Sequence, residues 1–179
     1  MFNTKPKSMK RLILTLAAVV ATATITVAQN YIVVNSEKVF KSVAAYNAAI
    51  TELDRLAESY QSQVDAKFKE VENLYNTYMS RKASMNAASQ TAVENQILTK
   101  EKEATKFQES IFGTDGTLMK KRIELIQPIQ KRVFKAIEEY SQQNGYELVL
   151  DIAQNAEVLY YSPKADHTQA IIEQVNKTK

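Results

Sequence analysis

The residues that could carry chemistry in this 179-residue chain are few and stand far apart. There is no Cys and only one His, so thiol chemistry, disulfides, iron–sulfur clusters and the usual zinc sites are excluded. The single histidine, His167, follows Asp166, a residue typical of helix caps, which places it on a predicted surface loop. It has no partner set that would make it a catalytic base. We therefore expect no catalytic role for His167.

The charged residues are typical of helix surfaces rather than of a site. Asp54, Asp65 and Glu70 fall on a predicted helix with no cleft that would shift their pKa values. The alternating charges of 100–103 favour a solvated helix face. The basic run 120–122 can meet phosphate or lipid headgroups, although we favour a solvated face here too. Because no phosphate-binding glycine loop or nucleophile elbow is present, we predict a protein that is not an enzyme and holds no cofactor or metal.

The first 28 residues have the three-part layout of a secretory signal peptide. Four basic residues lie between positions 5 and 11, an apolar run covers 12–20, and small residues lead to a cleavage site after Ala28. The alternative is a membrane anchor, but a spanning helix needs about 20 apolar residues and threonines dilute this run. The chain starts at Met1 or, if the first eight residues are an upstream extension, at Met9.

Removal of this segment changes the charge of the chain. The whole sequence has 23 Lys and Arg against 20 Asp and Glu, and the signal holds four of the basic residues and no acidic ones. The mature chain therefore has 19 against 20, a net charge of about −1. A near-neutral chain lacks the field that non-specific nucleic-acid binding requires, so we predict no nucleic-acid partner.

A long helical hairpin is the main element that the sequence predicts. Between residue 36 and residue 112 there is no Gly or Pro, which is far longer than an ordinary globular helix. Large apolar residues follow steps of three or four, as in a coiled coil: Ile50, Leu53, Leu56, Tyr60, Val64, Phe68, Val71, Leu74 and Tyr78. The polar stretch 85–93 predicts the tip, with Thr91 and Glu94 as a capping box that starts the return helix. Arms of about 35 to 50 residues would reach roughly 50 to 75 Å.

A second turn signal competes with that tip. The segment 112–116 holds two of the three glycines of the chain and could itself be the turn of the hairpin. We favour a local break within the return arm, because a turn here would leave much of the longer arm without a partner. Pro128 should then bend the return helix or leave a carbonyl unpaired, and Asn144 with Gly145 should end it.

Short strand-forming segments lie at both ends of the hairpin. Residues 31–34 predict a brief strand, and 146–152 with 157–161 predict a β-hairpin. Asn35 or Ser36 can cap the first helix, and Asp166 can cap a last helix over about 167–177. The predicted fold class is α+β, mostly α: one domain over 29–179, with a small β body from 31–34 and 146–161 and a helical hairpin over about 36–144.

Several segments, taken in order, resemble the OmpH/Skp family of periplasmic chaperones for outer-membrane proteins. They are the strand 31–34 followed by Val39 and Phe40, the segment 120–130, the segment 144–151, the pair Leu159 and Tyr160, and 166–168. The resemblance covers nearly the whole mature chain, and its specificity lies in the order of these segments. His167 stands where the family usually has an aliphatic residue.

The resemblance implies a jellyfish-like homotrimer in the periplasm, with three helical hairpins as arms. It implies an ATP-independent holdase that sequesters unfolded outer-membrane proteins between the arms, and a peripheral contact with membrane or lipopolysaccharide. The near-neutral mature chain departs from the strongly basic members, which puts the charge-driven part of such contacts in doubt. A structural coiled-coil scaffold or spacer of the cell envelope is the alternative function.

Two sets of residues follow as candidate sites. One short strand and one hairpin make too small a sheet to be stable alone, and its edges need partners. We therefore expect an intersubunit core of Tyr31, Ile32, Val33, Val34, Leu148, Val149, Leu150, Val158, Leu159 and Tyr160. Met and Tyr suit adaptable client contacts, which makes Tyr75, Tyr78, Met79 and Met85 candidates near the tip. The alternative, which we favour, is that these four form the seam of the hairpin.

Overall fold

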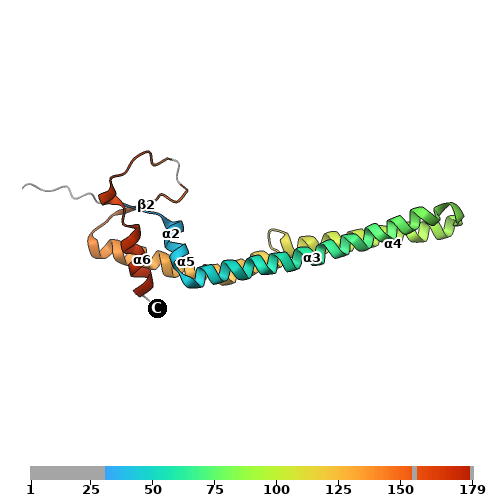
Figure 1. Cartoon of the computed structure of the whole chain (residues 1–179), viewed down its shortest axis with the longest axis horizontal. Coiled ribbons are helices and arrows are strands. Elements are labelled where there is room, and N and C mark those ends of the chain that lie inside the picture. Colours follow the sequence, from blue (N-terminus) through green and yellow to red (C-terminus); the bar gives the residue numbers. More distant parts are fainter. Residues whose placement is uncertain (1–30, 155–156, 178–179) are drawn as a thin grey trace, which may run out of the picture.

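A long antiparallel helical hairpin with a small body at its root makes up the computed structural model of the chain (Figure 1). The structure describes residues 31–154 and 157–177, so the signal-peptide prediction for 1–28 lies outside the described residues. Within the described part, no helix is both long and apolar enough to cross a membrane.

The outgoing arm begins with a short helix and continues as a long one. Helix α2 (Ser36–Ser42) is capped by Asn35, whose side chain accepts the N–H of Lys38 at 2.9 Å. Helix α3 (Ala44–Arg81) has 38 residues, a length of about 57 Å. The predicted single helix is interrupted at Val43, which adopts an extended conformation and is only 3% exposed. The break turns the side chain of Val43 into the core of the body.

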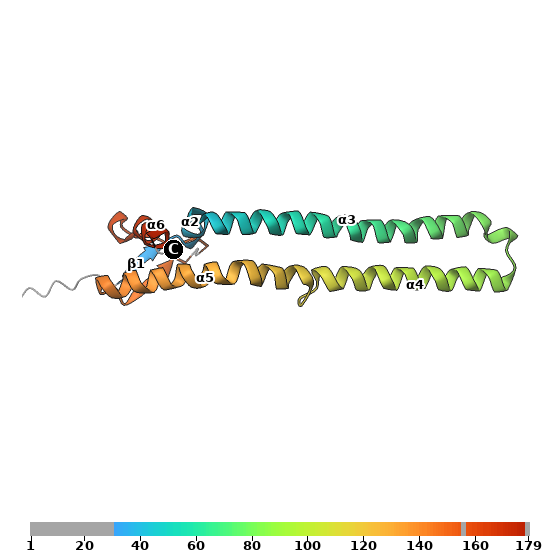
Figure 2. The same ribbon diagram turned by 90° about the horizontal axis from the view of Figure 1, so that it is seen from below.

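The tip lies slightly before its predicted position. A short 3₁₀ helix, η1 (Lys82–Ser84), leads into α4 (Ala87–Phe112), so the chain reverses over 82–86 rather than 85–93 (Figure 2). The predicted capping box is wrong, because Asn86 caps α4 by accepting the N–H of Ser89 at 2.8 Å. Thr91 therefore lies inside the helix.

The return arm is broken in two, as the glycines predicted. Helix α4 ends at Phe112 and α5 (Thr117–Asn144) follows after a loop that leaves the line of the arm (Figure 2). A Cβ at Gly113 would collide with the carbonyl oxygen of Glu109, and one at Gly116 with that of Ile111, so only glycine fits at both positions. The alternative, that this segment is the hairpin turn, is wrong.

Helix α5 continues through Pro128, which lacks the N–H that would bond to the carbonyl of Glu124. It ends at Asn144 and is capped by Gly145, whose φ of 73° lies in the left-handed region that glycine adopts without strain. Asn144 and Gly145 therefore end the return arm as predicted.

The sheet of the body has two parallel strands, β1 (Tyr31–Val34) and β2 (Leu148–Asp151), paired in register from Tyr31 opposite Leu148. The predicted β-hairpin between 146–152 and 157–161 is wrong. Described residues 157–161 form neither helix nor strand, and β2 pairs with β1 instead. The whole helical hairpin is thus the crossover connection that a parallel pair requires.

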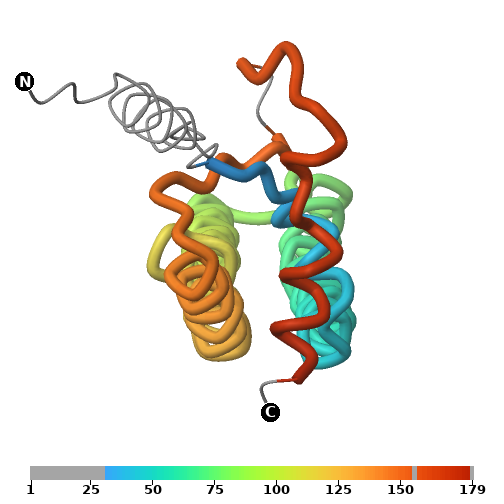
Figure 3. The backbone as a smooth tube through the Cα atoms, turned by 90° about the vertical axis from the view of Figure 1, so that its left-hand side faces the viewer, coloured from blue at the N-terminus to red at the C-terminus, as the bar shows by residue number. Residues whose placement is uncertain are grey.

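The core of the body lies where β1, α2, α5 and the last helix, α6 (Thr168–Lys177), meet. Val39, Val133, Ile171 and Val175 are fully buried there. A short 3₁₀ helix, η2 (Pro163–Ala165), precedes α6. As predicted, the side chain of Asp166 accepts the first N–H of α6, that of Thr168, at 2.9 Å. Figure 3, viewed along the arms, shows the two arms side by side with α6 at their root.

Candidate functional site

The seam near the tip contains one of the four predicted client-contact residues. Tyr78 is 4% exposed, and its hydroxyl donates a hydrogen bond to Glu94 on the opposite arm. Lys82 lies 3.5 Å from the same carboxylate and 5.2 Å from the centre of the Tyr78 ring. The hydrogen bond from Tyr78 lowers the pKa of Glu94, so this carboxylate stays ionised as the acceptor that joins the two arms. The structure thus places Tyr78 in the seam.

Two other predicted contact residues lie on the outside of α3. Tyr75 and Met79 are each 50% exposed and stand four residues apart, on one face of the helix. Phe68, seven residues before Tyr75, continues that face and is 37% exposed, although its spacing predicted a seam position. Met85 is half-buried at the tip. The arm therefore carries an exposed apolar face, formed by Phe68, Tyr75 and Met79.

Polar contacts between the arms involve residues that the sequence placed on solvated faces. Lys100 lies 2.9 Å from Glu70 across the seam, and a hydrogen bond from Lys100 lowers the pKa of Glu70. Lys67 lies 5.0 Å from the centre of the Phe107 ring. Exposed pairs of this kind contribute little to stability, so the arms are held together mainly by their narrow apolar seam.

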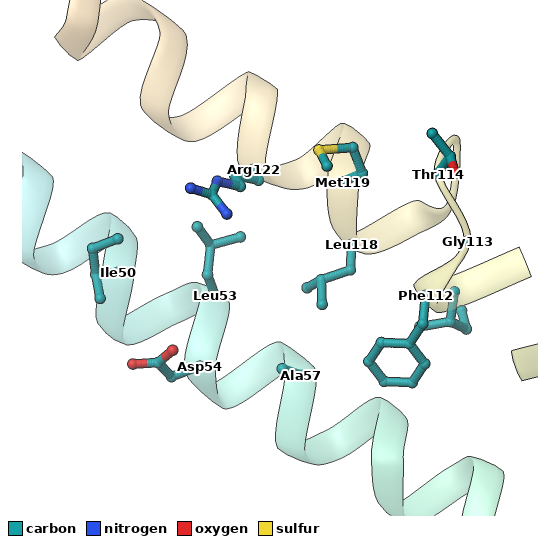
Figure 4. A pocket seen from close by; sticks show the side chains of 11 residues that line it. Ile50, Leu53, Asp54, Ala57, Phe112, Gly113, Thr114, Leu118, Met119 and Arg122 are labelled. Atoms are coloured by element: carbon teal, nitrogen blue, oxygen red, sulfur yellow. The ribbon is translucent and has the colours of Figure 1, made fainter. Parts of the chain in front are cut away.

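A groove opens where the glycine loop interrupts the return arm. This elbow groove has a volume of about 520 Å³ and lies between α3 and the junction of α4 with α5 (Figure 4). Its apolar wall comes from Leu53 on α3 and from Ile111, Phe112, Leu118 and Met119 on the return arm. Phe112 and Met119 are 38% and 42% exposed. The helical break leaves a gap in the seam and exposes apolar side chains beside it.

Two charged residues line the same groove from opposite helices. Asp54 extends from α3 and Arg122 from α5, both toward the end of the groove away from the loop (Figure 4). Both are exposed to solvent, and neither side chain makes a hydrogen bond or ion pair with the described residues. Sequence reasoning treated both as surface residues, because the groove that brings them together depends on the relative position of two helices.

The predicted intersubunit residues divide into a buried and an exposed group. Ile32, Val33 and Val34 are each 1% exposed and pack within the chain itself. Val149, Leu150 and Val158 are half-buried. The remaining four are exposed apolar side chains on one end of the molecule: Tyr31 at 40%, Leu148 at 52%, Leu159 at 95% and Tyr160 at 83%.

His167 is not on an exposed loop, and that prediction is wrong. Its ring is half-buried between two tyrosines, with Nδ1 2.8 Å from the hydroxyl of Tyr140 and Nε2 3.4 Å from that of Tyr146. Its backbone N–H donates to the carbonyl of Val33 at 3.0 Å, which draws residue 167 against β1. His167 therefore lies in a polar site of the body that the rings of Tyr140 and Tyr146 line.

Asp151 joins the end of β2 to the start of α2. Its carboxylate accepts the N–H and hydroxyl of Ser36 at 3.1 and 2.5 Å and the N–H of Ala153 at 3.0 Å. Burial acts to raise the pKa of Asp151, but these hydrogen bonds outweigh it and hold the pKa below the ordinary value of 3.8. The ionised form is thus the one that fits the folded body.

This shift predicts an acid-sensitive joint. Because the folded pKa of Asp151 is lowered, its contribution to stability is present above the unfolded pKa and is lost as the pH falls through the folded pKa. The urea concentration at which half of the protein is unfolded should decrease when the pH is lowered below about 4. Asp151→Asn should reduce this dependence on pH. Ser36→Ala should reduce the dependence to a smaller extent, because the N–H of Ala153 still bonds to Asp151. Unfolding is measured by circular dichroism. If both variants lose stability in acid as the parent does, Asp151 does not have this role.

Among the described residues there is no group of three or more His, Cys, Asp or Glu that could hold a metal ion. The charged run 120–122 is also partly neutralised within the chain, since Lys121 lies 2.9 Å from Glu124. The described residues therefore provide an exposed apolar face on the arm, a groove beside the glycine loop, and exposed apolar side chains at the end of the body.

Comparison with known proteins gives the family of the chain. Residues 30–175 match the family described as "Outer membrane protein (OmpH-like)". No curated protein matches the chain. A similar fold is found in the crystal structure of a candidate outer membrane chaperone (OmpH-like) from Caulobacter crescentus CB15. The TM-score is 0.62 at 10% identity, over 84% of this chain and 85% of that one. Because the family match spans nearly all the described residues, this chain belongs to the OmpH-like outer membrane protein family.

Proposed function

We propose that the chain is an ATP-independent holdase of the periplasm, which sequesters unfolded outer-membrane proteins between the arms of a homotrimer. The observation that carries this proposal is the exposed apolar face on a long, thin arm, formed by Phe68, Tyr75 and Met79. The two helices of the arm pack mainly on each other, so the arm can move relative to the body. A movable arm suits clients of varied size.

The chemistry of the arm favours many weak contacts. Methionine adapts its shape to irregular partners, and tyrosine combines an apolar ring with a polar hydroxyl. Unfolded outer-membrane proteins present apolar side chains in alternation with polar ones, so no single deep pocket would serve them. Release then needs no nucleotide, because each contact is weak and the client leaves when it finds a more stable environment.

Trimerisation is supported by the exposed end of the body. A two-stranded sheet is marginal by itself, and the open edge of β2 would pair readily with another chain. Leu148, Leu159 and Tyr160 are large apolar side chains in contact with solvent at that end. A second and third copy of the chain would cover them and set three arms around a common space.

An aggregation assay tests the holdase function. A urea-unfolded β-barrel outer-membrane protein is diluted into buffer with residues 29–179 and without nucleotide, and light scattering is followed. We expect scattering to be suppressed near stoichiometric amounts. If several-fold molar excess has no effect, the holdase proposal fails and the scaffold alternative is favoured.

The contact face is tested in the same assay. Tyr75→Ala with Met79→Ala should weaken the suppression, because these two side chains supply exposed apolar area to the client. The matched control is Asn76→Ala with Ser80→Ala, on exposed positions one residue further along the same helix. If the first variant loses only helix stability in circular dichroism and still suppresses aggregation, the face is not a client contact.

A further inference from the structure

We propose that Met79 is a site of reversible oxidation, at which a peroxide converts the thioether to the sulfoxide and thereby weakens the holding of clients. The oxidised side chain makes the exposed face of Phe68, Tyr75 and Met79 polar at one of its three positions. This inference rests on the proposed function and deepens it, since it names a modification that regulates the same face.

The sulfur of the described chain lies on the arm. The sequence has no Cys and five Met, of which Met1 and Met9 fall in the predicted signal peptide. The other three are Met79 on α3, Met85 at the tip and Met119 on α5. Among the described residues, no methionine belongs to the buried core of the body. A peroxide that oxidises these side chains therefore changes the arm and leaves the packing of the body intact.

Met79 combines access to solvent with a place on the apolar face. It is 50% exposed, Met119 is 42% exposed, and Met85 is half-buried. Tyr75, one helical turn before Met79, is also 50% exposed on the same face. Because neither side chain closes the seam, as the 4% exposed Tyr78 does, the fold tolerates a polar atom at position 79. Oxidation at Met79 thus alters the surface of α3 rather than its packing on α4.

The reaction with hydrogen peroxide balances without a further reactant. A lone pair of the thioether sulfur attacks one peroxide oxygen, the O–O bond breaks, an S–O bond forms, and water leaves after proton transfer. Sulfur is oxidised by an electron pair that reduces the peroxide. A methionine sulfoxide reductase reverses the step with a dithiol, which becomes a disulfide while the sulfoxide oxygen leaves as water.

The sulfoxide changes what the face can bind. A thioether is apolar and adapts its shape to irregular partners, whereas a sulfoxide is polar and has an oxygen that needs a hydrogen-bond donor. An apolar client side chain that covers this oxygen removes its water and gives no hydrogen bond in return. The contact at Met79 is therefore lost on oxidation, while Tyr75 still contributes its ring.

The test combines mass spectrometry with the aggregation assay. Residues 29–179 are treated with hydrogen peroxide, which is then removed, and the sulfoxide at each methionine is measured by mass spectrometry of peptides. We expect Met79 and Met119 to be oxidised before Met85. About five-fold more of the oxidised chain than of the reduced chain should be needed for equal suppression of aggregation. Treatment with methionine sulfoxide reductases for both epimers and a dithiol should restore the suppression.

Two leucine variants identify the methionine responsible. Met79→Leu keeps an apolar side chain without sulfur, so its suppression, at whatever level, should be the same before and after peroxide. Met119→Leu removes a comparably exposed methionine outside the face, so it should lose suppression on oxidation as the parent does. The circular dichroism of the parent should not change on oxidation.

The inference is overturned if oxidation lowers the suppression of Met79→Leu as much as that of the parent, or if Met119→Leu is protected. The reduced parent separates the two proposals. If it suppresses aggregation and the oxidised parent does so equally well, only this inference is removed. If the reduced parent gives no suppression, the holdase proposal fails and this inference fails with it.

Discussion

Replacement of Ile171 by Ala is expected to destabilise the body by about 2 to 5 kcal/mol. Ile171 is fully buried where α6 meets β1, α2 and α5, so the shortened side chain leaves a cavity that rigid neighbours on several elements cannot close. The melting temperature, measured by circular dichroism, should fall by about 4 to 20 °C.

Ile123→Ala is the matched control for this change. Ile123 lies on α5 and is 51% exposed, so the same deletion there should alter the free energy of unfolding by less than about 0.5 kcal/mol. Equal effects of the two variants would mean that the body is not the cooperative core from which the arms extend.

Replacement of Leu148 by Asp is expected to separate the proposed trimer into single chains. Leu148 is 52% exposed on β2, opposite Tyr31, and a trimer would cover it with apolar atoms of a neighbouring chain. A carboxylate buried there without a partner would cost far more than the contact contributes. Light scattering coupled to size-exclusion chromatography should report the mass of one chain for the variant and of three chains for the parent.

Leu98→Asp is the matched control, because it introduces the same charge at an equally exposed leucine. Leu98 is also 52% exposed, but it lies on α4, far along the arm from the body. The mass of this variant should equal that of the parent. If Leu148→Asp also keeps the parent mass, the end of the body that carries β2 is not the joint between chains.

The arms could be predicted from sequence because their signals are local. Apolar spacing, the lack of Gly and Pro over 36–112, the break at 113–116 and the end at Gly145 each act within a few residues. The match to the OmpH-like family confirms the resemblance and, with it, the prediction that the chain is not an enzyme.

The sheet, the histidine and the groove depended on contacts distant in sequence. The pairing of β2 with β1 joins residues more than a hundred positions apart, and the strand-forming pattern of 157–161 gave no sign that β2 would have another partner. His167 is drawn inward by Val33, and the elbow groove exists only because α3 passes the glycine loop. None of these relations leaves a periodic or spacing signal in the chain.

The most direct test of the central claim, three arms around one client, is the mass of the complex. Light scattering should give three chains for residues 29–179 alone, and three chains with one client after an unfolded outer-membrane protein is added. A single-chain mass in both samples, or a complex in which one chain carries the client by itself, would contradict the account.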